Sequence, residues 1–187
     1  MDVQSLLFER RLTASLLILS FMAFLVVGYL FTARVIWKLP TAQTELHLRW
    51  ERGFVIGAFL INVLGFVLLE NMLRNAGDTI LARLAMAIYL ISAVVMVVAE
   101  TTYLNNREGV YPQFVLHVVL AFLAQAAFGA ALLRTGLVVP WAGWATLIWN
   151  LALLVIMPIA YPHDIYFPWL HYVAPLIIGI ALLLRGS

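Results

Sequence analysis

The sequence predicts an all-α protein, an integral membrane bundle of six transmembrane helices joined by short loops. Two observations lead to this fold class. Of the 187 residues, 65% are hydrophobic and only 11% are charged, which is too little polar surface to cover a water-soluble globule. The apolar residues also gather in runs of about 20, the length of helix that crosses about 30 Å of hydrocarbon.

Six apolar segments follow one another along the chain, and each is expected to be a helix because backbone groups in lipid must bond within their own segment. They are 12–37, 53–73, 81–102, 112–133, 140–160 and 169–184. The first is longer than the apolar core of a signal peptide and shows no small-residue cleavage pattern, so we expect it to be retained. The last is the shortest. Together they predict one transmembrane helical domain over residues 1–187.

Proline and capping residues support these helix boundaries. Pro112, Pro140 and Pro168 lie at or just before segment starts, where a missing amide hydrogen costs least. Asp78 and Thr79 are expected to cap the third helix. The one longer connection, residues 38–52, alternates apolar and charged residues in its second half and is predicted to lie along the membrane interface.

Arginine and lysine residues favour one orientation by a small margin. With a cytoplasmic N-terminus, six of them fall on the inner side and five on the outer side. The six are Arg10, Arg11, Arg74, Arg83, Arg134 and Arg185, and the five are Arg34, Lys38, Arg49, Arg52 and Arg107. We therefore expect both termini to be cytoplasmic.

Charge and cysteine content exclude several classes of function. The net charge of +2 comes from scattered residues and not from a basic stripe, so no nucleic acid is expected as a partner. The absence of cysteine excludes thiolate catalysis, disulfide exchange and iron–sulfur clusters. The expected partners are the lipid bilayer and either another membrane protein or further copies of this chain.

The middle of the predicted spans carries uncharged polar residues and no ionisable one. The polar residues are Ser20, Asn62, Ser92, Gln125 and Asn150. We interpret them as interhelical hydrogen-bonding groups, each contributing about 0.6 kcal/mol, with a polar path or a ligand pocket as the alternative. The lack of central ionisable groups counts against a proton-coupled pump.

The ionisable residues of the spans gather near the outer face, where they form a candidate polar site. Its members are Glu100, His117, His163, Asp164 and His171. Counting along the helices places Glu100, His117 and His171 at similar depth. These three could bind a transition metal, with His163 and Asp164 as further ligands or as general acid–base groups.

The metal hypothesis has competitors. No HxxxH or HExxH spacing places two ligands on one helix face, so the sequence predicts no cofactor outright, and haem ligation by His117 and His171 is the weaker metal alternative. Histidines at a membrane boundary also face the headgroups, as the surrounding aromatic residues are expected to do. This outer aromatic belt comprises Trp37, Trp50, Tyr103, Tyr111, Tyr161, Tyr166, Trp169 and Tyr172, opposite Trp141 and Trp144.

Three stretches of the chain resemble small bacterial multi-pass membrane proteins that are catalogued only as domains of unknown function. They are residues 129–158, which begin GAALLRTGLVVPWAGW, residues 164–185, which begin DIYFPWLHYVAP, and the connection at 73–95. The resemblance implies a compact helical bundle in the bacterial inner membrane with its N-terminus in the cytoplasm. It implies no activity and no catalytic residue.

Two classes of function therefore remain. The favoured hypothesis is a non-enzymatic membrane component, either a subunit or assembly partner of a membrane complex or a binder of lipid or small apolar ligands. The alternative is a membrane-embedded enzyme that acts on a lipid-like substrate at the outer interface through the His/Glu/Asp site. A transporter is a weaker third hypothesis, because a bundle this small would need to dimerise.

Overall fold

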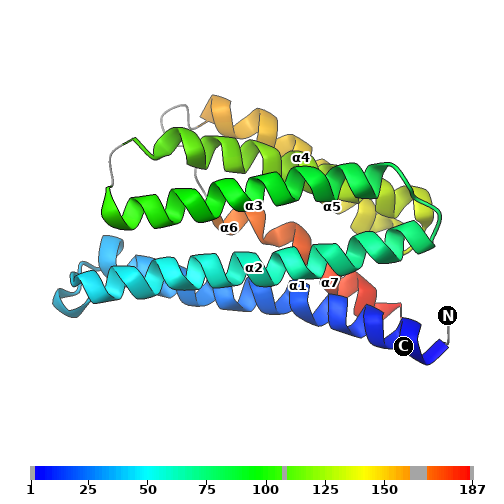
Figure 1. Ribbon diagram of the computed structural model, residues 1–187, viewed down its shortest axis with the longest axis horizontal. Helices are drawn as coiled ribbons and strands as arrows, with labels where there is room; N and C mark the ends of the chain where they lie inside the picture. Colours follow the sequence, from blue (N-terminus) through cyan, green and yellow to red (C-terminus); the bar gives the residue numbers. More distant parts are fainter. Residues whose placement is uncertain (1–2, 107–108, 161–167, 186–187) are drawn as a thin grey trace.

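In the computed structural model, residues 3–106, 109–160 and 168–185 are described, and these ranges are helical without any strand. The elements are α1 (Val3–Phe31), the π-helix η1 (Thr32–Ile36), the 3-10 helix η2 (Pro40–Ala42), α2 (Glu45–Asn75), α3 (Leu81–Asn105), α4 (Tyr111–Thr135), α5 (Pro140–Ala160), α6 (Pro168–His171) and α7 (Val173–Leu184). Figure 1 shows the long helices lying roughly along one axis, with both chain termini at the same end of the bundle.

Five helices of the described ranges are long and apolar enough to cross a membrane, which confirms the predicted all-α membrane bundle. The sixth apolar segment, predicted as a span over residues 169–184, differs from that prediction. Its main element, α7, has 12 residues and is about 18 Å long, well short of about 30 Å of hydrocarbon. α6 precedes it as a separate element of four residues.

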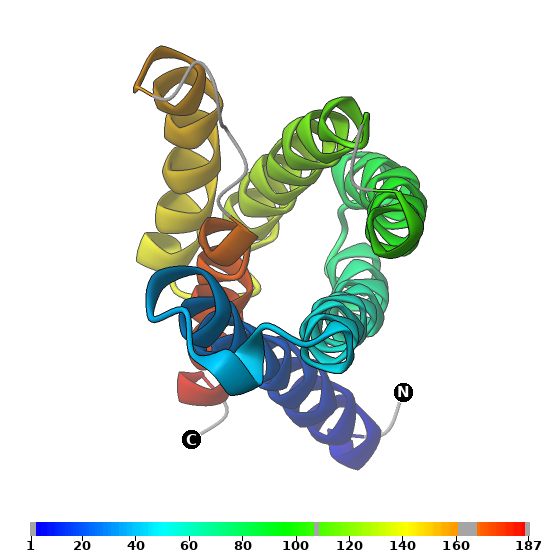
Figure 2. The same cartoon turned by 90° about the vertical axis from the view of Figure 1, so that its left-hand side faces the viewer.

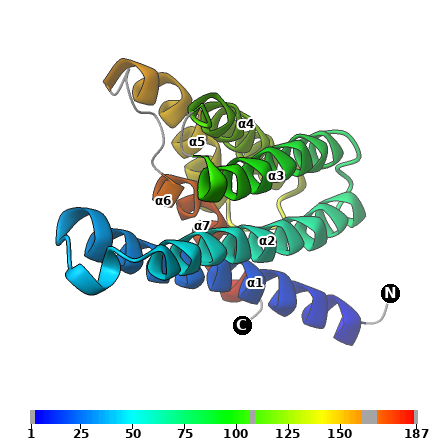
Figure 3. The same ribbon diagram turned by 60° about the vertical axis from the view of Figure 1, so that its left-hand side comes forward.

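The start of α2 also differs from the prediction. Residues 45–52, expected along the membrane interface, form the first two turns of this helix. Thr44 caps the helix by accepting a hydrogen bond from the His47 amide at 3.2 Å. Their alternation of apolar and charged residues has another cause: Glu51 and Arg52 are buried against neighbouring helices, whereas Arg49 is exposed. The α1–α2 hairpin, with η1 and η2 at its tip, is visible in Figure 3.

The predicted cap of α3 is confirmed for Asp78. Its Oδ1 accepts hydrogen bonds from the amides of Ala82 at 3.0 Å and Ile80 at 3.2 Å. These bonds satisfy two of the amides that the first turn of a helix leaves without partners.

The long helices and α7 form a closed ring. Each of α1 to α5 packs against its neighbour in sequence, α5 packs against α7, and α7 returns to α1. Figure 2, which looks along the bundle, shows this arrangement. Because each helix meets two neighbours, its buried stripe faces the middle of the ring while its remaining face is exposed.

Aromatic rings fill the middle of the ring of helices. Phe66 of α2 stacks on Phe128 of α4 with ring centroids 4.7 Å apart, and it also contacts the Tyr89 ring of α3 at 4.6 Å. Phe59 lies two turns earlier on α2 and also stacks on Tyr89, at 5.4 Å. Rings from α2, α3 and α4 therefore meet in the middle of the bundle.

Small residues let neighbouring backbones approach closely. A Cβ atom at Gly129 of α4 would lie 2.7 Å from the Leu147 amide nitrogen of α5, and one at Gly143 of α5 would lie 2.8 Å from the Leu133 side chain. Gly129 and Gly143 thus let α4 and α5 pack closely, as small residues do at helix interfaces in membranes.

We expect the substitution Gly129→Ala to lower the free energy of unfolding by about 1–3 kcal/mol, because the new methyl group would meet backbone that cannot move alone. Gly57→Ala on α2 is the matched control: no atom lies within 4 Å of its Cβ position, so this change should be neutral or stabilise by up to about 1 kcal/mol. Unfolding in mixed detergent micelles measures both. Equal effects at the two glycines would contradict the close packing of α4 on α5.

Candidate functional site

A break between α6 and α7 places a backbone carbonyl in the middle of the bundle. Pro175 lies four residues after His171 and has no amide hydrogen, so the His171 carbonyl has no helical donor. Gln125 of α4 supplies one instead, through Nε2 at 3.0 Å. The indole of Trp149 on α5 donates to the preceding carbonyl, that of Leu170, at 3.1 Å. Side chains of two helices thus replace the missing helical hydrogen bonds.

The His171 side chain lies deeper than the sequence predicted. Gln125, which contacts it, is 14 residues from the first residue of α4 and 10 from the last. Asn62, which belongs to the same hydrogen-bonded chain, is 17 residues from the start of α2 and 13 from its end. The prediction that no ionisable group lies at the middle of the spans is therefore wrong. α7 is short, so His171, just before its first residue, lies level with the middle of α2 and α4.

The imidazole of His171 ends a chain of hydrogen bonds that crosses the ring of helices. The Ser20 hydroxyl of α1 lies 3.3 Å from Asn62 Oδ1, and Asn62 Nδ2 donates to the Tyr89 hydroxyl at 2.8 Å. The Tyr89 oxygen lies 2.7 Å from His171 Nε2. Because Tyr89 accepts from Asn62, its own proton is available to His171 Nε2.

His117 lies beside His171 and is held by Ser92. Its Nδ1 is 2.8 Å from the Ser92 hydroxyl and 3.3 Å from the Ser92 carbonyl, which can only accept, so Nδ1 carries the hydrogen. The Ser92 hydroxyl in turn donates to the His117 carbonyl at 3.1 Å. The two imidazole centroids are 5.4 Å apart, and the Phe59 ring contacts both, at 5.1 and 5.3 Å. We call His117, His171, Tyr89 and Phe59 the central cluster.

Glu100, the third residue predicted at this depth, has a different set of partners. Its carboxylate accepts from Arg52 of α2 at 3.1 and 3.3 Å, and the Arg52 guanidinium also contacts Glu51 at 3.0 Å. Glu51 is paired on its other side with Arg34 of η1, in a two-pronged contact with both distances 2.7 Å. Tyr103 covers Arg52, with the guanidinium carbon 4.3 Å from its ring centroid.

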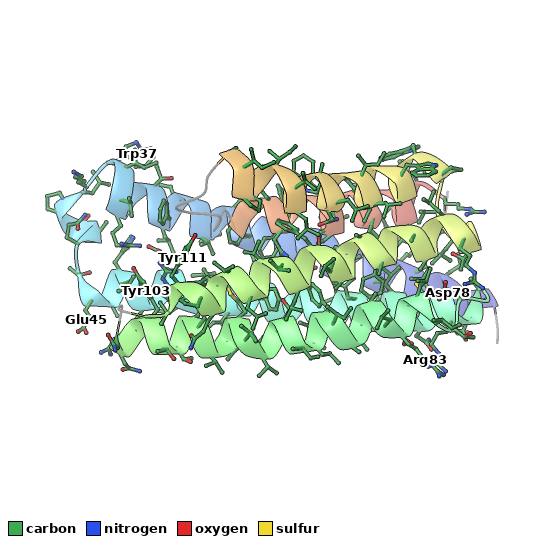
Figure 4. The ribbon with its side chains drawn as sticks, turned by 90° about the horizontal axis from the view of Figure 1, so that it is seen from above. Trp37, Glu45, Asp78, Arg83, Tyr103 and Tyr111 are labelled. Carbon is green, nitrogen blue, oxygen red and sulfur yellow. The ribbon has the colours of Figure 1, made fainter. Side chains whose placement is uncertain are left out.

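These residues form a buried charged network at one end of the bundle, and its charges balance as two arginines and two glutamates. Figure 4 shows this end, marked by Trp37, Glu45, Tyr103 and Tyr111, opposite the end that carries Asp78 and Arg83. From Ala82 to Glu100 is 18 residues of α3, or about 27 Å, close to the thickness of hydrocarbon. The central cluster therefore lies between two polar ends.

The metal hypothesis receives no ligand set from the described residues. Among them, no group of three or more His, Asp or Glu side chains lies close enough to hold one ion. His117 and His171 alone are fewer than the three or four ligands of protein zinc sites. His163 and Asp164 fall outside the described residues, so their part in the predicted site stays a prediction.

Sequence reasoning missed two members of this region. Tyr89 was not singled out, since a tyrosine within a span is common among apolar residues. Tyr172 was assigned to the outer aromatic belt, but it is buried in the bundle and stacks on Phe24 of α1 at 4.3 Å. The spacing of Pro175 four residues after His171 was the signal that could have indicated an interrupted helix.

Comparison of the chain with protein-family models, with curated proteins and with solved structures finds no match. The inferences that follow therefore rest on the geometry described above.

We expect Gln125→Leu to cost about 1–3 kcal/mol, because it leaves the His171 carbonyl buried without a donor. This cost is larger than the average contribution of one hydrogen bond between membrane helices, which is about 0.6 kcal/mol. In a Pro175→Ala background the new amide can serve that carbonyl, so the same substitution should cost less than about 1 kcal/mol. A double-mutant cycle of unfolding free energies measures the difference; equal costs in both backgrounds would contradict this role of Pro175.

We expect Arg52→Met to destabilise the bundle by about 3–5 kcal/mol, since it removes a buried cation from beside Glu100. Adding Glu100→Gln should restore much of the loss. Arg49→Met, three residues earlier on α2, is the control. Arg49 pairs with Glu45 at 3.7 Å and both side chains are exposed, so the expected loss of stability is about 0–1 kcal/mol. Melting temperatures in detergent compare the three; a loss at Arg52 no larger than that at Arg49 contradicts a buried network.

Proposed function

We propose that this chain is a multi-pass protein of the bacterial inner membrane, with both termini in the cytoplasm, that binds a small and mostly apolar ligand within its ring of helices. The observation that carries the proposal is the pair of histidines in the middle of the bundle. Ionisable residues at this depth are costly, and they commonly mark sites of function.

The distribution of arginines supports the orientation. At the end opposite Asp78, Arg34 and Arg52 are bound in ion pairs with glutamates. At the Asp78 end, where both termini lie, five arginines are exposed: Arg11, Arg74, Arg83, Arg134 and Arg185. Cytoplasmic sides of membrane proteins carry an excess of arginine and lysine. Arg74 and Arg134 also lie near carboxylates, Glu70 at 3.5 Å and Asp78 at 4.0 Å, so the support for this orientation remains the small margin in the sequence.

The surroundings of the histidines support binding. Small-molecule sites are usually lined by apolar and aromatic side chains with a few fixed polar groups. The central cluster has this composition, because aromatic rings surround two imidazoles whose orientations are fixed by Tyr89 and Ser92. Every one of these side chains comes from a long helix or from the α6–α7 break, which holds it in place.

The geometry favours a binder over an enzyme. The enzymatic alternative needs a carboxylate that works with the histidines at the outer interface. Glu100 is instead engaged with Arg52 in the charged network, and His117 is bonded to Ser92. Neither arrangement leaves a carboxylate–imidazole pair for proton transfer among the described residues.

Reporter fusions test the orientation. A reporter at Ser187 should give a cytoplasmic signal, and one inserted within residues 161–167 should give a signal from the outer side. Matching signals at the two positions would contradict the even number of crossings, and a cytoplasmic signal from residues 161–167 would contradict the orientation.

Native mass spectrometry tests the binding function. The protein released from detergent should carry a small molecule, and the molecule should be lost in His171→Phe, which keeps an aromatic ring but removes its hydrogen bonds. The control, Ile159→Ala, changes a side chain on α5 that is 76% exposed and should keep the molecule. A partner protein bound at fixed stoichiometry would instead favour an assembly role, and an empty chain that purifies alone would contradict both.

A further inference from the structure

Four completely or almost completely buried side chains near the α6–α7 break each have one oxygen without a hydrogen-bond partner in the described part of the chain. These atoms are Gln125 Oε1, Asn150 Oδ1, Thr146 Oγ1 and Tyr172 Oη. A buried polar atom without a partner costs about 1–3 kcal/mol, so such atoms call for an explanation.

The orientations of the two amides are fixed by their other hydrogen bonds. Gln125 Nε2 donates to the His171 carbonyl, and Asn150 Nδ2 donates to the Thr146 carbonyl at 2.7 Å. Carbonyls only accept, so the nitrogen of each amide must be the atom placed there. The remaining atoms are therefore both oxygens, which can accept hydrogen bonds but cannot donate them.

Gln125 and Asn150 lie at the same height on facing helices. α4 and α5 run in opposite directions, and Gly129 of α4 meets Leu147 of α5. One turn further along each helix, Gln125 comes opposite Asn150. Thr146 is one turn from Asn150 on the same buried face of α5.

The α6–α7 break lies at this same height. The Leu170 carbonyl accepts a hydrogen bond from Trp149, the residue before Asn150 on α5. The His171 carbonyl accepts one from Gln125 of α4, whose own oxygen is unpaired. Tyr172 is the residue at the break, with its ring centroid 5.2 Å from the His171 ring. Facing residues of α4 and α5 thus bring two unpaired oxygens to one height of an apolar interior, with Thr146 one turn away, whereas the Tyr172 ring stacks on Phe24 of α1.

From this arrangement we infer that the site takes a lipid-soluble alcohol or phenol, whose hydroxyl donates to Asn150 Oδ1, opposite Gln125 Oε1. The inference rests on the proposed function and names its ligand class. Two acceptor-only oxygens require a donor, so a ketone or quinone cannot satisfy them, although the hydroxyls of Thr146 and Tyr172 can both donate and accept. In the described part of the chain no hydrogen bond links Gln125 or Asn150 to a charged side chain, which favours a neutral donor over an ammonium group.

Three probes with one skeleton test the ligand class: 1-phenylethanol donates and accepts, acetophenone only accepts, and ethylbenzene does neither. Titrating each into the detergent-solubilised protein and following the melting temperature gives its affinity. We expect the alcohol to bind about five- to tenfold more tightly than the ketone, the factor that one net hydrogen bond supplies.

Asn150→Leu should abolish most of this preference at little cost to the stability of the free protein, because the lost oxygen had no partner and the lost Nδ2 bond goes to a carbonyl of the same helix. Asn71→Leu, an exposed change on α2, should keep the preference. A preference that survives in Asn150→Leu would place the alcohol elsewhere and overturn the assignment.

The other outcomes separate the inference from the function on which it rests. If the ketone binds as tightly as the alcohol, or all three probes bind equally, the ligand class is wrong while binding stands. If no probe shifts the melting temperature of the parent, the proposed binding function fails as well. The melting temperature could also rise when choline chloride is replaced with sodium chloride. A rise that disappears in Asn150→Leu would mean that the oxygens hold a cation, and it would overturn the assignment of an alcohol.

Discussion

The arrangement of this protein depends on one hydrogen bond, from the Gln125 amide to the His171 carbonyl. Hydrocarbon offers no water to a backbone group, so every carbonyl there needs a donor from the protein. Pro175 removes the helical donor of this carbonyl, and a side chain from α4 replaces it. The interrupted helix can exist at this depth only because α4 and α5 present an amide and an indole to it.

The rest of the central cluster follows from that break. α6 ends at His171, in the middle of the bundle. This position brings His171 to the level of Asn62 and Tyr89. The imidazole then needs a partner, and the chain from Ser20 to Tyr89 supplies it. Phe59 of α2 packs against both imidazoles, so polar and apolar requirements are met by the same few residues.

The two polar regions of the molecule differ in charge and in hydrogen bonding. The charged network at the Trp37 end pairs each charge with an opposite one, so it joins η1, α2 and α3 without leaving net charge. The region around the break is uncharged in its acceptors, and several of its oxygens are unpaired among the described residues. The first arrangement serves stability, whereas the second retains hydrogen-bonding capacity that a well-packed apolar interior would lack.

The sequence was sufficient to predict what depends on local properties. Hydropathy located all six apolar segments, five of them as helices long enough to span, and the Asp78 cap followed from one residue and its position. Contacts across the ring could not be predicted, because they depend on the rotation of each helix about its axis. Counting residues placed Glu100 beside the histidines, but its face of α3 meets Arg52.

The sixth segment shows the same limit. Its apolar composition indicates a span, yet a single proline and the donors on two other helices decide where the helix breaks. These donors are separated from Pro175 by 50 residues for Gln125 and 26 for Trp149, so no local pattern contains them. The prediction failed at the place where the candidate site lies.

The central claim is that His171 lies in the dry middle of the bundle, bonded to Tyr89. Solid-state nuclear magnetic resonance of the protein in lipid bilayers, with histidine nitrogens and tyrosine carbons labelled, tests this directly. We predict a close contact between His171 Nε2 and the Tyr89 hydroxyl group, with slow exchange of its proton with water. A His171 ring that exchanges rapidly with water and contacts lipid headgroups instead of Tyr89 would contradict the account.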